Sequence, residues 1–313
     1  MPPAPDIFGG SSVLGIGTAA LAVPYGAPGA TRPAPDPTLA RRTLLSAVER
    51  GVRLIDTAPA YGEAESLVGE ALGGREDCVI ATKVAIPQGG WERLSGEQTR
   101  LHIRTSAEAS LRALGRERLD VLQVHNADEA LVRGGAVGEA LVGLCDSGLV
   151  GMTGATVYGE ANALAVIASP AFQLVQVAFS ALDRRAERAV LPAAIAAGTT
   201  VVARSLLLRG VLSPAGRGMN GRYGVLAAEA DAVRVALGAS WEELPGAAVA
   251  FALSRPGIAC ALLGPREESE LIALLEGAER FKDAVATLEL AAPDLPDWLL
   301  DPSRWPPESA GVL

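Results

Sequence analysis

The sequence predicts an α/β fold of the (β/α)8 TIM barrel type, and three observations support that prediction. Eight short apolar segments alternate along the chain with helical stretches, which is the count of a closed parallel barrel. A length of 313 residues is ordinary for one such barrel. Titratable side chains end three consecutive apolar segments, where barrels of this type carry their active sites. We therefore expect one domain over residues 1–313, with loops and a C-terminal arm, residues 292–313, packed over the C-terminal face.

The expected strands and helices alternate from the first segment to the last. The first strand, VLGIG, leads to a helix that starts after Asp36 and Pro37 and stops before Gly51. A doubly wound sheet would show the same alternation, but it needs a glycine-rich phosphate turn after its first strand, and GIGTAA is a poor version of that turn. The expected strands are 13–17, 53–56, 78–83, 119–125, 149–155, 173–179, 199–205 and 258–264. The expected helices are 38–50, 63–72, 97–114, 136–147, 159–168, 185–197, 225–237, 244–254 and 267–276.

The composition excludes several classes of protein. Hydrophobic residues make up 49% of the chain and aromatic residues only 4%, so the core is expected to consist of Ala, Leu and Val. A formal net charge of -9 with dispersed arginines provides no basic stripe for nucleic acid. No apolar stretch of about 18 residues occurs, so we expect no membrane span. The three cysteines lie far apart in apolar stretches and no metal-ligand spacing is present, so we expect a soluble cytoplasmic protein without a metal.

The scarcity of lysine makes one position a candidate for catalysis. Only Lys83 and Lys282 among the 27 basic residues are lysines, and Lys83 ends the apolar run CVIATK. An ammonium is a compact charge that can change the proton affinity of a neighbouring group, which a planar guanidinium does poorly. The alternative is a strand-end lysine that only reaches for water.

Two more strand ends carry groups that can act with this lysine. RLIDTAPAYG ends a strand at Asp56 and places Tyr61 five residues later, and LDVLQVH ends another strand at His125. Taken singly, Asp56 could form a turn, Tyr61 could anchor a loop and His125 could be a structural core imidazole. Because consecutive parallel strands are neighbours in a barrel, we expect Asp56, Lys83 and His125 to converge, with Tyr61 beside them.

At these residues the chain resembles the aldo-keto reductase family, in a bacterial branch, over nearly its whole length. The stretches that carry the resemblance are LGIGTAAL, RLIDTAPAYGEAESLVGEAL, VIATKV, RLDVLQVHN, VQVAFSALDRR and GPREESELIALL. The spacing of Asp56, Tyr61, Lys83 and His125 matches the catalytic tetrad of that family. The resemblance implies reduction of an aldehyde or ketone to an alcohol by a nicotinamide cofactor.

The chemistry of these four groups suits that reaction. Tyr61 could deliver a proton to the substrate oxygen, and the ammonium of Lys83 would stabilise the phenolate that remains. Asp56 would hold Lys83 charged and oriented. A neutral His125 could donate a hydrogen bond to the carbonyl oxygen.

The resemblance also implies a cofactor site, with substitutions at several positions. Thr156 and Val157 stand where relatives bind the nicotinamide amide with a Ser-Asn pair, whereas Gln176 is retained. Arg204 stands where an aromatic residue often stacks on the nicotinamide, and this cation would disfavour the oxidised ring. Arg266 stands where relatives bind the 2′-phosphate of NADP, so we expect NADPH, with NADH as the alternative. The expected cofactor residues are Thr156, Gln176, Arg204, Ser205, Leu206, Gly264 and Arg266.

Two features oppose the expected phosphate site. Glu267 and Glu268 follow Arg266 directly and would repel a phosphate, although their side chains can rotate into solvent. Ala273 and Leu274 stand where relatives clamp the adenine with a Glu-Asn pair. We expect the attraction of Arg266 for the phosphate to dominate.

The loops expected at the rim of the pocket contain aromatic and polar residues. The expected substrate residues are Tyr25, Trp91, Asn126 and Tyr223, and Met219 and Trp298 lie in the same loops. Such a set suits a ring or a sugar-like carbonyl compound, although the same residues could anchor loops onto the barrel. We expect a small-molecule carbonyl substrate as the partner, no nucleic-acid or membrane partner, and a monomer or weak homodimer.

Two other functions fit parts of the pattern. A cofactor-binding sensor or regulatory protein would keep the fold with little turnover; the altered positions 156–157 and 273–274 favour it, whereas the intact tetrad disfavours it. A non-redox lyase or dehydratase could use Tyr61 and Lys83 for proton transfer without net hydride transfer. The absorbance of NADPH during turnover distinguishes the three functions.

Overall fold

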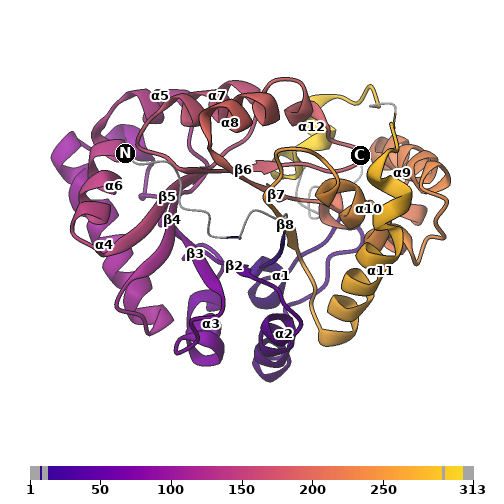
Figure 1. Ribbon diagram of the computed structural model, residues 1–313, viewed down its shortest axis with the longest axis horizontal. Helices are drawn as coiled ribbons and strands as arrows, with labels where there is room; N and C mark the ends of the chain where they lie inside the picture. Colours follow the sequence, from indigo (N-terminus) through magenta and orange to yellow (C-terminus); the bar gives the residue numbers. More distant parts are fainter. Residues whose placement is uncertain (1–7, 9–12, 291–292, 306–313) are drawn as a thin grey trace.

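The computed structural model describes residue 8, residues 13–290 and residues 293–305, and its strands form a closed parallel barrel surrounded by helices (Figure 1). The strands follow one another around the barrel in chain order, and β8 pairs with β1 to close it. The strands are β1 (Val13–Gly17), β2 (Leu54–Asp56), β3 (Val79–Val84), β4 (Leu119–Val124), β5 (Val150–Thr156), β6 (Leu174–Ala178), β7 (Thr200–Arg204) and β8 (Cys260–Leu263). The predicted (β/α)8 barrel is confirmed, with strand bounds close to those expected.

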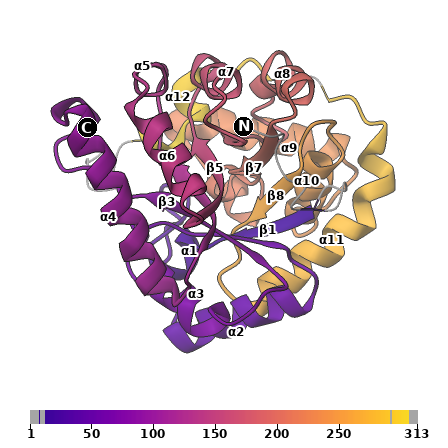
Figure 2. The same cartoon turned by 60° about the vertical axis from the view of Figure 1, so that its left-hand side comes forward.

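Helices form the outer layer, and a second view shows them enclosing the strands (Figure 2). The α-helices are α1 (Ala19–Ala22), α2 (Pro37–Glu49), α3 (Ala64–Leu72), α4 (Gly96–Leu114), α5 (Glu129–Arg133), α6 (Ala136–Asp146), α7 (Glu160–Ala168), α8 (Val190–Ala197), α9 (Gly224–Ala236), α10 (Leu244–Leu253), α11 (Glu268–Ala286) and α12 (Asp297–Leu300). The 3-10 helices are η1 (Trp91–Arg93), η2 (Arg185–Glu187), η3 (Leu208–Gly210), η4 (Pro214–Gly218), η5 (Gly221–Tyr223) and η6 (Pro302–Arg304). The sequence pattern does not predict the short helices α1, α5 and α12.

Two expected helices differ from the observed ones, each for a local reason. The stretch expected as one helix at 185–197 is divided into η2 and α8, because Pro192 has no N–H and is tolerated only in the first turn of a helix. Helix α11, which the sequence predicts to end at residue 276, ends at Ala286. Its buried positions keep the helical spacing past residue 276, so the apolar face extends the helix. These positions are Leu271, Leu274, Ala278, Phe281 and Val285.

The barrel interior consists of an apolar layer and a polar layer. The apolar layer is a cluster of buried side chains: Leu54, Ala81, Val121, Met152, Leu174, Val202, Cys260 and Leu262. Because strand side chains alternate between the two faces, the residue two positions farther along a strand also points into the barrel. On β2, β3, β4 and β6 these residues are Asp56, Lys83, Gln123 and Gln176. The polar layer therefore lies at the C-terminal end of the barrel.

Helices α10 and α11 cross at two glycines. A Cβ atom on Gly246 would lie 2.5 Å from the Cα atom of Gly277, and one on Gly277 would lie 2.8 Å from the Cα atom of Gly246. The two backbones touch at this point, which requires glycine on both sides. Both glycines line the cavity described below, so this crossing sets the position of one cavity wall.

The chain after α11 contributes to the apolar cluster between the strands and the helices. Leu295, Leu299 and Trp305 are buried members of that cluster, and Trp305 Nε1 donates to the carbonyl oxygen of Leu299 at 3.1 Å. Residues 292 and 306–313 of the expected arm lie outside the described residues, so the arm and the single domain stay predictions. In the part of the chain that the structure describes, no helix is long and apolar enough to cross a membrane.

We expect Gly246→Ala to lower the free energy of unfolding by about 1–3 kcal/mol, because the added methyl group meets the backbone of Gly277 and forces the helices apart. Gly143→Ala is the matched control. Gly143 also lies inside a helix, but a Cβ atom there meets nothing within 4 Å, so alanine should stabilise the protein by up to about 1 kcal/mol. Chemical denaturation measures both changes, and equal effects at the two glycines would contradict the close crossing.

Candidate active site

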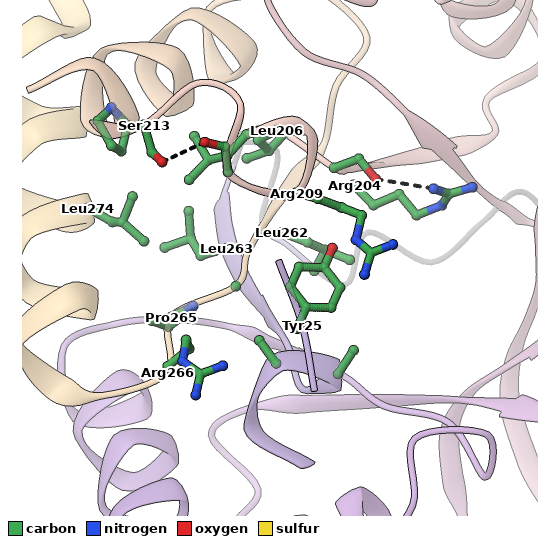
Figure 3. A pocket seen from close by; sticks show the side chains of 18 of the residues that line it. Tyr25, Arg204, Leu206, Arg209, Ser213, Leu262, Leu263, Pro265, Arg266 and Leu274 are labelled. Atoms are coloured by element: carbon green, nitrogen blue, oxygen red, sulfur yellow. Dashed lines mark hydrogen bonds between the residues drawn. The ribbon is translucent and has the colours of Figure 1, made fainter. Parts of the chain in front are cut away.

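A cavity of about 1100 Å³ opens beside the polar layer of the barrel. It reaches from Lys83 inside the barrel to Arg266 in the loop before α11. Figure 3 shows Tyr25 and Arg209 side by side, between Arg204 on one side of the view and Arg266 on the other. Polar and charged side chains thus follow the whole length of the cavity.

An ion pair between Lys83 and Asp56 lies at the inner end of the cavity. Lys83 Nζ lies 2.7 Å from Asp56 Oδ2 and also donates to the carbonyl oxygen of Thr57 at 2.8 Å. The Lys83 and Asp56 side chains are only 1% and 4% exposed. Burial alone would lower the pKa of Lys83, but the charge of Asp56 and the interaction with Tyr61 outweigh it and hold that pKa above its usual value. Lys83 is therefore a buried ammonium.

Two glutamines bind the other oxygen of Asp56. Gln123 Nε2 donates to Asp56 Oδ1 at 3.0 Å, and Gln176 Nε2 donates to the same atom at 2.8 Å. The amides also bind each other, from Gln176 Nε2 to Gln123 Oε1 at 3.3 Å. The expected cofactor residue Gln176 thus contacts the ion pair while it lines the cavity. The sequence-based prediction misses Gln123, although its place two residues before His125 in an apolar strand indicates an inward-facing polar group.

A turn after β2 places Tyr61 beside Lys83. The N–H of Tyr61 donates to the carbonyl oxygen of Ala58 at 3.0 Å, which closes a four-residue turn with Pro59 at its second position. Lys83 Nζ lies 4.9 Å from the centroid of the Tyr61 ring. Tyr61 is partly exposed and lines the cavity, so a phenol meets a buried ammonium at the cavity wall.

His125 completes the inner end of the cavity. Its ring meets the Tyr61 ring edge to face, with centroids 5.9 Å apart and planes at 89°. Burial lowers the pKa of His125 to about 4, and the charge of Lys83 acts in the same direction. His125 is therefore neutral near pH 7, and its buried Nδ1 has no hydrogen-bond partner among the described residues. The structure thus brings Asp56, Tyr61, Lys83 and His125 to one end of the cavity.

The expected cofactor residues on β5 and β7 are held by their neighbours. Thr156 Oγ1 accepts a hydrogen bond from the N–H of Asn126 at 2.8 Å. This bond supports Asn126, the residue directly after His125, in a backbone conformation with a φ of 54°. Arg204 donates to the carbonyl oxygen of Val157 at 3.0 Å, and its guanidinium lies over the Tyr158 ring, 4.2 Å from the centroid. The guanidinium of Arg204 is therefore fixed against the loop after β5.

Strained backbone follows β7. Ser205, Leu208 and Arg209 have φ values of 62°, 44° and 54°, a region that residues with side chains rarely adopt. This loop places the Arg209 guanidinium 5.1 Å from the centroid of the Tyr25 ring. Ser205 and Leu206 line the cavity in the same loop, as expected cofactor residues. Arg209 Nε is buried without a hydrogen-bond partner among the described residues. The strained backbone of residues 205, 208 and 209 is typical of ligand-binding positions.

Charged groups of both signs meet at the outer end of the cavity. The Arg266 guanidinium donates to the carbonyl oxygen of Arg32 at 3.3 Å and to that of Pro33. Arg32 pairs with one oxygen of Glu270 at 2.7 Å, and the N–H of Arg266 donates to the other oxygen at 2.9 Å. Gly264 lines the cavity beside Arg266. Two cations and one carboxylate therefore lie together at this end.

The two glutamates directly after Arg266 are engaged elsewhere. Glu267 accepts from the hydroxyl of the serine two residues farther on at 2.6 Å, and Glu268 accepts from Ser46 Oγ of α2 at 2.8 Å. Burial and the charge of Arg32 lower the pKa of Arg266, and Glu270 opposes them more strongly than Glu267 does. The carboxylate that matters most at this end is therefore one that the sequence prediction does not single out.

The expected substrate residues separate into two groups. Tyr25 and Asn126 line the cavity, whereas Trp91 and Tyr223 are not among its lining residues. Trp91 packs edge to face on His102, with ring centroids 5.6 Å apart. Tyr223 packs against two tryptophans after α11, with centroids 6.2 Å and 5.4 Å away. These two contacts are the loop anchoring that the sequence left open as the alternative.

Several cavity residues are missing from the sequence-based prediction. Among them are Arg32, Tyr158, Arg209 and Glu270. Tyr158 follows the end of β5 by two residues, so strand ends are a signal that could have found it. Arg209 follows the end of β7 by five residues, the same separation that Tyr61 has from the end of β2, so it carries the same signal. Arg32 carries no such signal, because only the folding of its loop brings it to the cavity. Among the described residues, no three His, Cys, Asp or Glu side chains gather as a metal site requires.

Comparison with known proteins gives a consistent result. The model of the "Aldo/keto reductase family" matches residues 13–286. Aldo-keto reductase YhdN of Bacillus subtilis (strain 168) is 31% identical over 178 residues, which cover 55% of this chain and 53% of that protein. The NADH-specific methylglyoxal reductase of Escherichia coli (strain K12) is 29% identical over 189 residues, which cover 55% of this chain and 57% of that protein. The chain thus spans about half the length of these curated relatives.

Solved structures extend the similarity over the whole barrel. The holo form of aldo-keto reductase AKR11C1 from Bacillus halodurans has 25% sequence identity to this chain and a TM-score of 0.71. The match covers 91% of this chain and 94% of that one. The similarity in structure therefore extends over most of both chains.

The neutral state of His125 predicts a loss of stability in acid. An imidazole of the unfolded chain binds its proton near pH 6.5, whereas His125 in the folded protein binds it at about pH 4. The unfolded state therefore binds more protons between these values, and the free energy of unfolding falls as the pH falls from 6.5 to 4. The difference of about 2.5 pKa units corresponds to roughly 3 kcal/mol at its full extent.

His125→Gln should remove this part of the pH dependence. Between about pH 7.5 and pH 4.5, its free energy of unfolding should fall by about 2 kcal/mol less than that of the unmutated protein, as measured by guanidinium denaturation. His102→Gln removes a histidine that does not line the cavity and serves as the control. The same pH dependence in His125→Gln and the unmutated protein would mean that His125 is not held neutral in the fold.

Proposed function

The chain belongs to the aldo/keto reductase family, and from this premise we propose that it is an NAD(P)H-dependent oxidoreductase that reduces an aldehyde or ketone to an alcohol. The observation that supports the proposal best is the inner end of the cavity, where a phenol and a neutral imidazole lie beside a buried ammonium. A carbonyl group that receives a hydride on its carbon gains negative charge on its oxygen and needs a proton. These groups can supply a proton, a hydrogen bond and a positive charge at one point.

In this proposal Tyr61 gives its phenolic proton to the carbonyl oxygen. The Lys83 ammonium stabilises the phenolate: at about 5 Å and an effective dielectric constant of about 20, two opposite unit charges attract by about 3 kcal/mol. Asp56 keeps Lys83 protonated, and the neutral His125 donates a hydrogen bond to the carbonyl oxygen. The nicotinamide cofactor, when bound, supplies the hydride.

The cavity has the size and the donors for a dinucleotide. Its volume of about 1100 Å³ is at the upper end of the usual range of small-molecule pockets. Arg209 Nε has no hydrogen-bond partner among the described residues, so the Arg209 guanidinium offers a donor that suits a phosphate oxygen. We assign cofactor binding to Thr156, Gln176, Arg204, Ser205, Leu206, Gly264 and Arg266, all of which line the cavity.

We also propose that the protein prefers NADPH to NADH. Arg266 and Arg32 place two cations at the outer end of the cavity, with the carboxylate of Glu270 between them. Glu267 and Glu268 bind serine hydroxyls, which reduces the repulsion that their position in the sequence suggests. NADH is the alternative cofactor, since the Escherichia coli relative named above is NADH-specific.

The proposed substrate is a small carbonyl compound, and Tyr25 and Asn126 are the residues of the cavity lining that we assign to it. Burial raises the pKa of the Tyr25 phenol, although Arg209 and Arg204 oppose that effect. Tyr25 therefore stays neutral and offers an aromatic face beside the cations. Asn126 is exposed at the cavity wall and adds an amide, so an oxygenated carbonyl compound suits this end better than a purely apolar one.

Tyr61→Phe should lower kcat for carbonyl reduction by about 10²–10⁴-fold, because it removes the acidic proton and little else. The Kd of NADPH, measured by fluorescence titration, should stay close to that of the unmutated protein. Lys83→Arg should lower kcat almost as far, since a guanidinium cannot replace the compact ammonium beside Asp56. A loss below about tenfold for Tyr61→Phe would reject Tyr61 as the proton donor.

The absorbance of NADPH separates the proposed function from its alternatives. Its steady loss with a panel of aldehydes and ketones supports a reductase. Cofactor binding without any loss would indicate a sensor, and product formation without net loss would indicate a lyase or dehydratase.

Arg266→Ala should weaken NADPH binding by about 10- to 100-fold and leave NADH binding nearly unchanged, because a charge-assisted contact with the 2′-phosphate contributes about 1.5–3 kcal/mol. The effect should shrink as salt is added. Arg280→Ala is the matched control: Arg280 lines the same cavity, but it is paired with Glu243 at 2.6 Å and should not distinguish the cofactors. Equal Kd values for NADPH and NADH in the unmutated protein at low salt would refute the preference.

A further inference from the structure

We propose that Gln123 is a positioning residue for the proton transfer, because it holds the Asp56 carboxylate in the orientation that serves Lys83. The inference rests on the proposed function, since it concerns how Tyr61 is made ready to give its proton. Gln123 is buried and is not among the residues that line the cavity. It therefore acts through Asp56 and has no direct contact with a substrate.

The two oxygens of Asp56 have separate partners. Oδ2 accepts from Lys83 Nζ at 2.7 Å, whereas Oδ1 accepts from Gln123 Nε2 at 3.0 Å and from Gln176 Nε2 at 2.8 Å. All four residues are buried, with exposed fractions of 0% to 3%. Solvent has little access to this group, so a lost amide donor is not readily replaced by water.

Gln123 also fixes the second glutamine. Gln123 Oε1 accepts from Gln176 Nε2 at 3.3 Å, so the amide nitrogen of Gln176 is directed to Gln123 and Asp56. Loss of Gln123 removes one donor from Asp56 and one acceptor from Gln176. The carboxylate then has a single amide donor and more freedom to rotate away from Lys83.

A neutral amide suits position 123 better than a charged group. A cation there would compete with Lys83 for Asp56, and a carboxylate would repel Asp56. Gln123 on β4 is the register partner of Lys83 on β3. Strand β4 therefore places an uncharged donor beside the Lys83 ammonium, and this donor binds the Asp56 carboxylate that pairs with Lys83. The amide supplies hydrogen bonds without changing the charge of the site.

Gln123→Met keeps the length of the side chain and removes its N–H groups. We expect kcat to fall by about tenfold or more, while KM for the carbonyl compound and the Kd of NADPH change by less than about threefold. A lower kcat with nearly unchanged KM and Kd distinguishes loss of positioning from damage to the cavity. Gln173→Met is the matched control, because Gln173 is a buried glutamine of the barrel wall that accepts from the N–H of Thr153 at 3.4 Å. Its kcat should stay within about twofold of the unmutated protein.

Gln123→Glu tests the hydrogen bond itself. A glutamic acid side chain has nearly the same shape, but it can donate to Asp56 Oδ1 only while it is protonated. Burial and the neighbouring Asp56 carboxylate raise the proton affinity of the new glutamate, whereas the Lys83 ammonium opposes them. Because one ammonium serves two buried carboxyl groups, the glutamate should keep its proton into the near-neutral range. We expect the ratio of the variant kcat to the unmutated kcat to fall about tenfold from about pH 5.5 to pH 8.5. The same ratio for Gln123→Met should stay constant.

The outcomes distinguish this role from the proposed function. A kcat of Gln123→Met within about threefold of the unmutated protein, or a pH-independent ratio for Gln123→Glu, would overturn the positioning role. Unmutated protein that binds NADPH but reduces no aldehyde or ketone would overturn the proposed function, and the positioning role with it. Circular dichroism checks that each variant is folded, and the isosteric Gln123→Glu decides alone if Gln123→Met does not fold.

Discussion

Burial of the Lys83 ammonium is the constraint on which the rest of the structure depends. An isolated charge inside the barrel would be unfavourable by many kcal/mol, so a carboxylate must stand opposite it. Asp56 on β2 pairs with Ala81 on β3, and Ala81 precedes Lys83 by two residues. This register brings the Asp56 carboxylate within reach of the Lys83 ammonium. Removing one partner of such a buried pair typically costs about 3–5 kcal/mol. The pairing of β2 with β3 and the chemistry of the cavity are therefore fixed by the same contact.

Strand alternation connects the apolar core to the polar site. Leu54 and Val121 lie in the apolar layer, and Asp56 and Gln123 follow two residues later in the polar layer above it. A shift of one residue in either strand would turn the carboxylate or the amide outward and bring an unsuitable side chain in. The amides bind the carboxylate without adding charge, so the layer is one connected hydrogen-bond network, and buried networks of this kind favour one arrangement of the core.

The sequence predicts much of the fold and the inner end of the site, but little of the outer end. Apolar strands that end in Asp56, Lys83 and His125 carry a local pattern, and barrel topology converts that pattern into proximity. Contacts made by loops have no such pattern. The carbonyl oxygens of Arg32 and Pro33 accept hydrogen bonds from Arg266, and the Glu268 side chain contacts α2. Both contacts depend on long-range packing that no short stretch encodes. Aromatic residues in loops are ambiguous for the same reason, and the packing of Trp91 on His102 is an example.

The unequal burial of the two lysines has a practical consequence for attaching the protein to a surface. Lys83 is completely enclosed, whereas the Lys282 side chain is 56% exposed on α11 and does not line the cavity. Reagents that acylate amines therefore meet one accessible lysine side chain besides the α-amino group of the chain, while the arginines remain unmodified. A resin or electrode coupled through that lysine would hold the molecules in nearly one orientation, with the ammonium inside the barrel untouched.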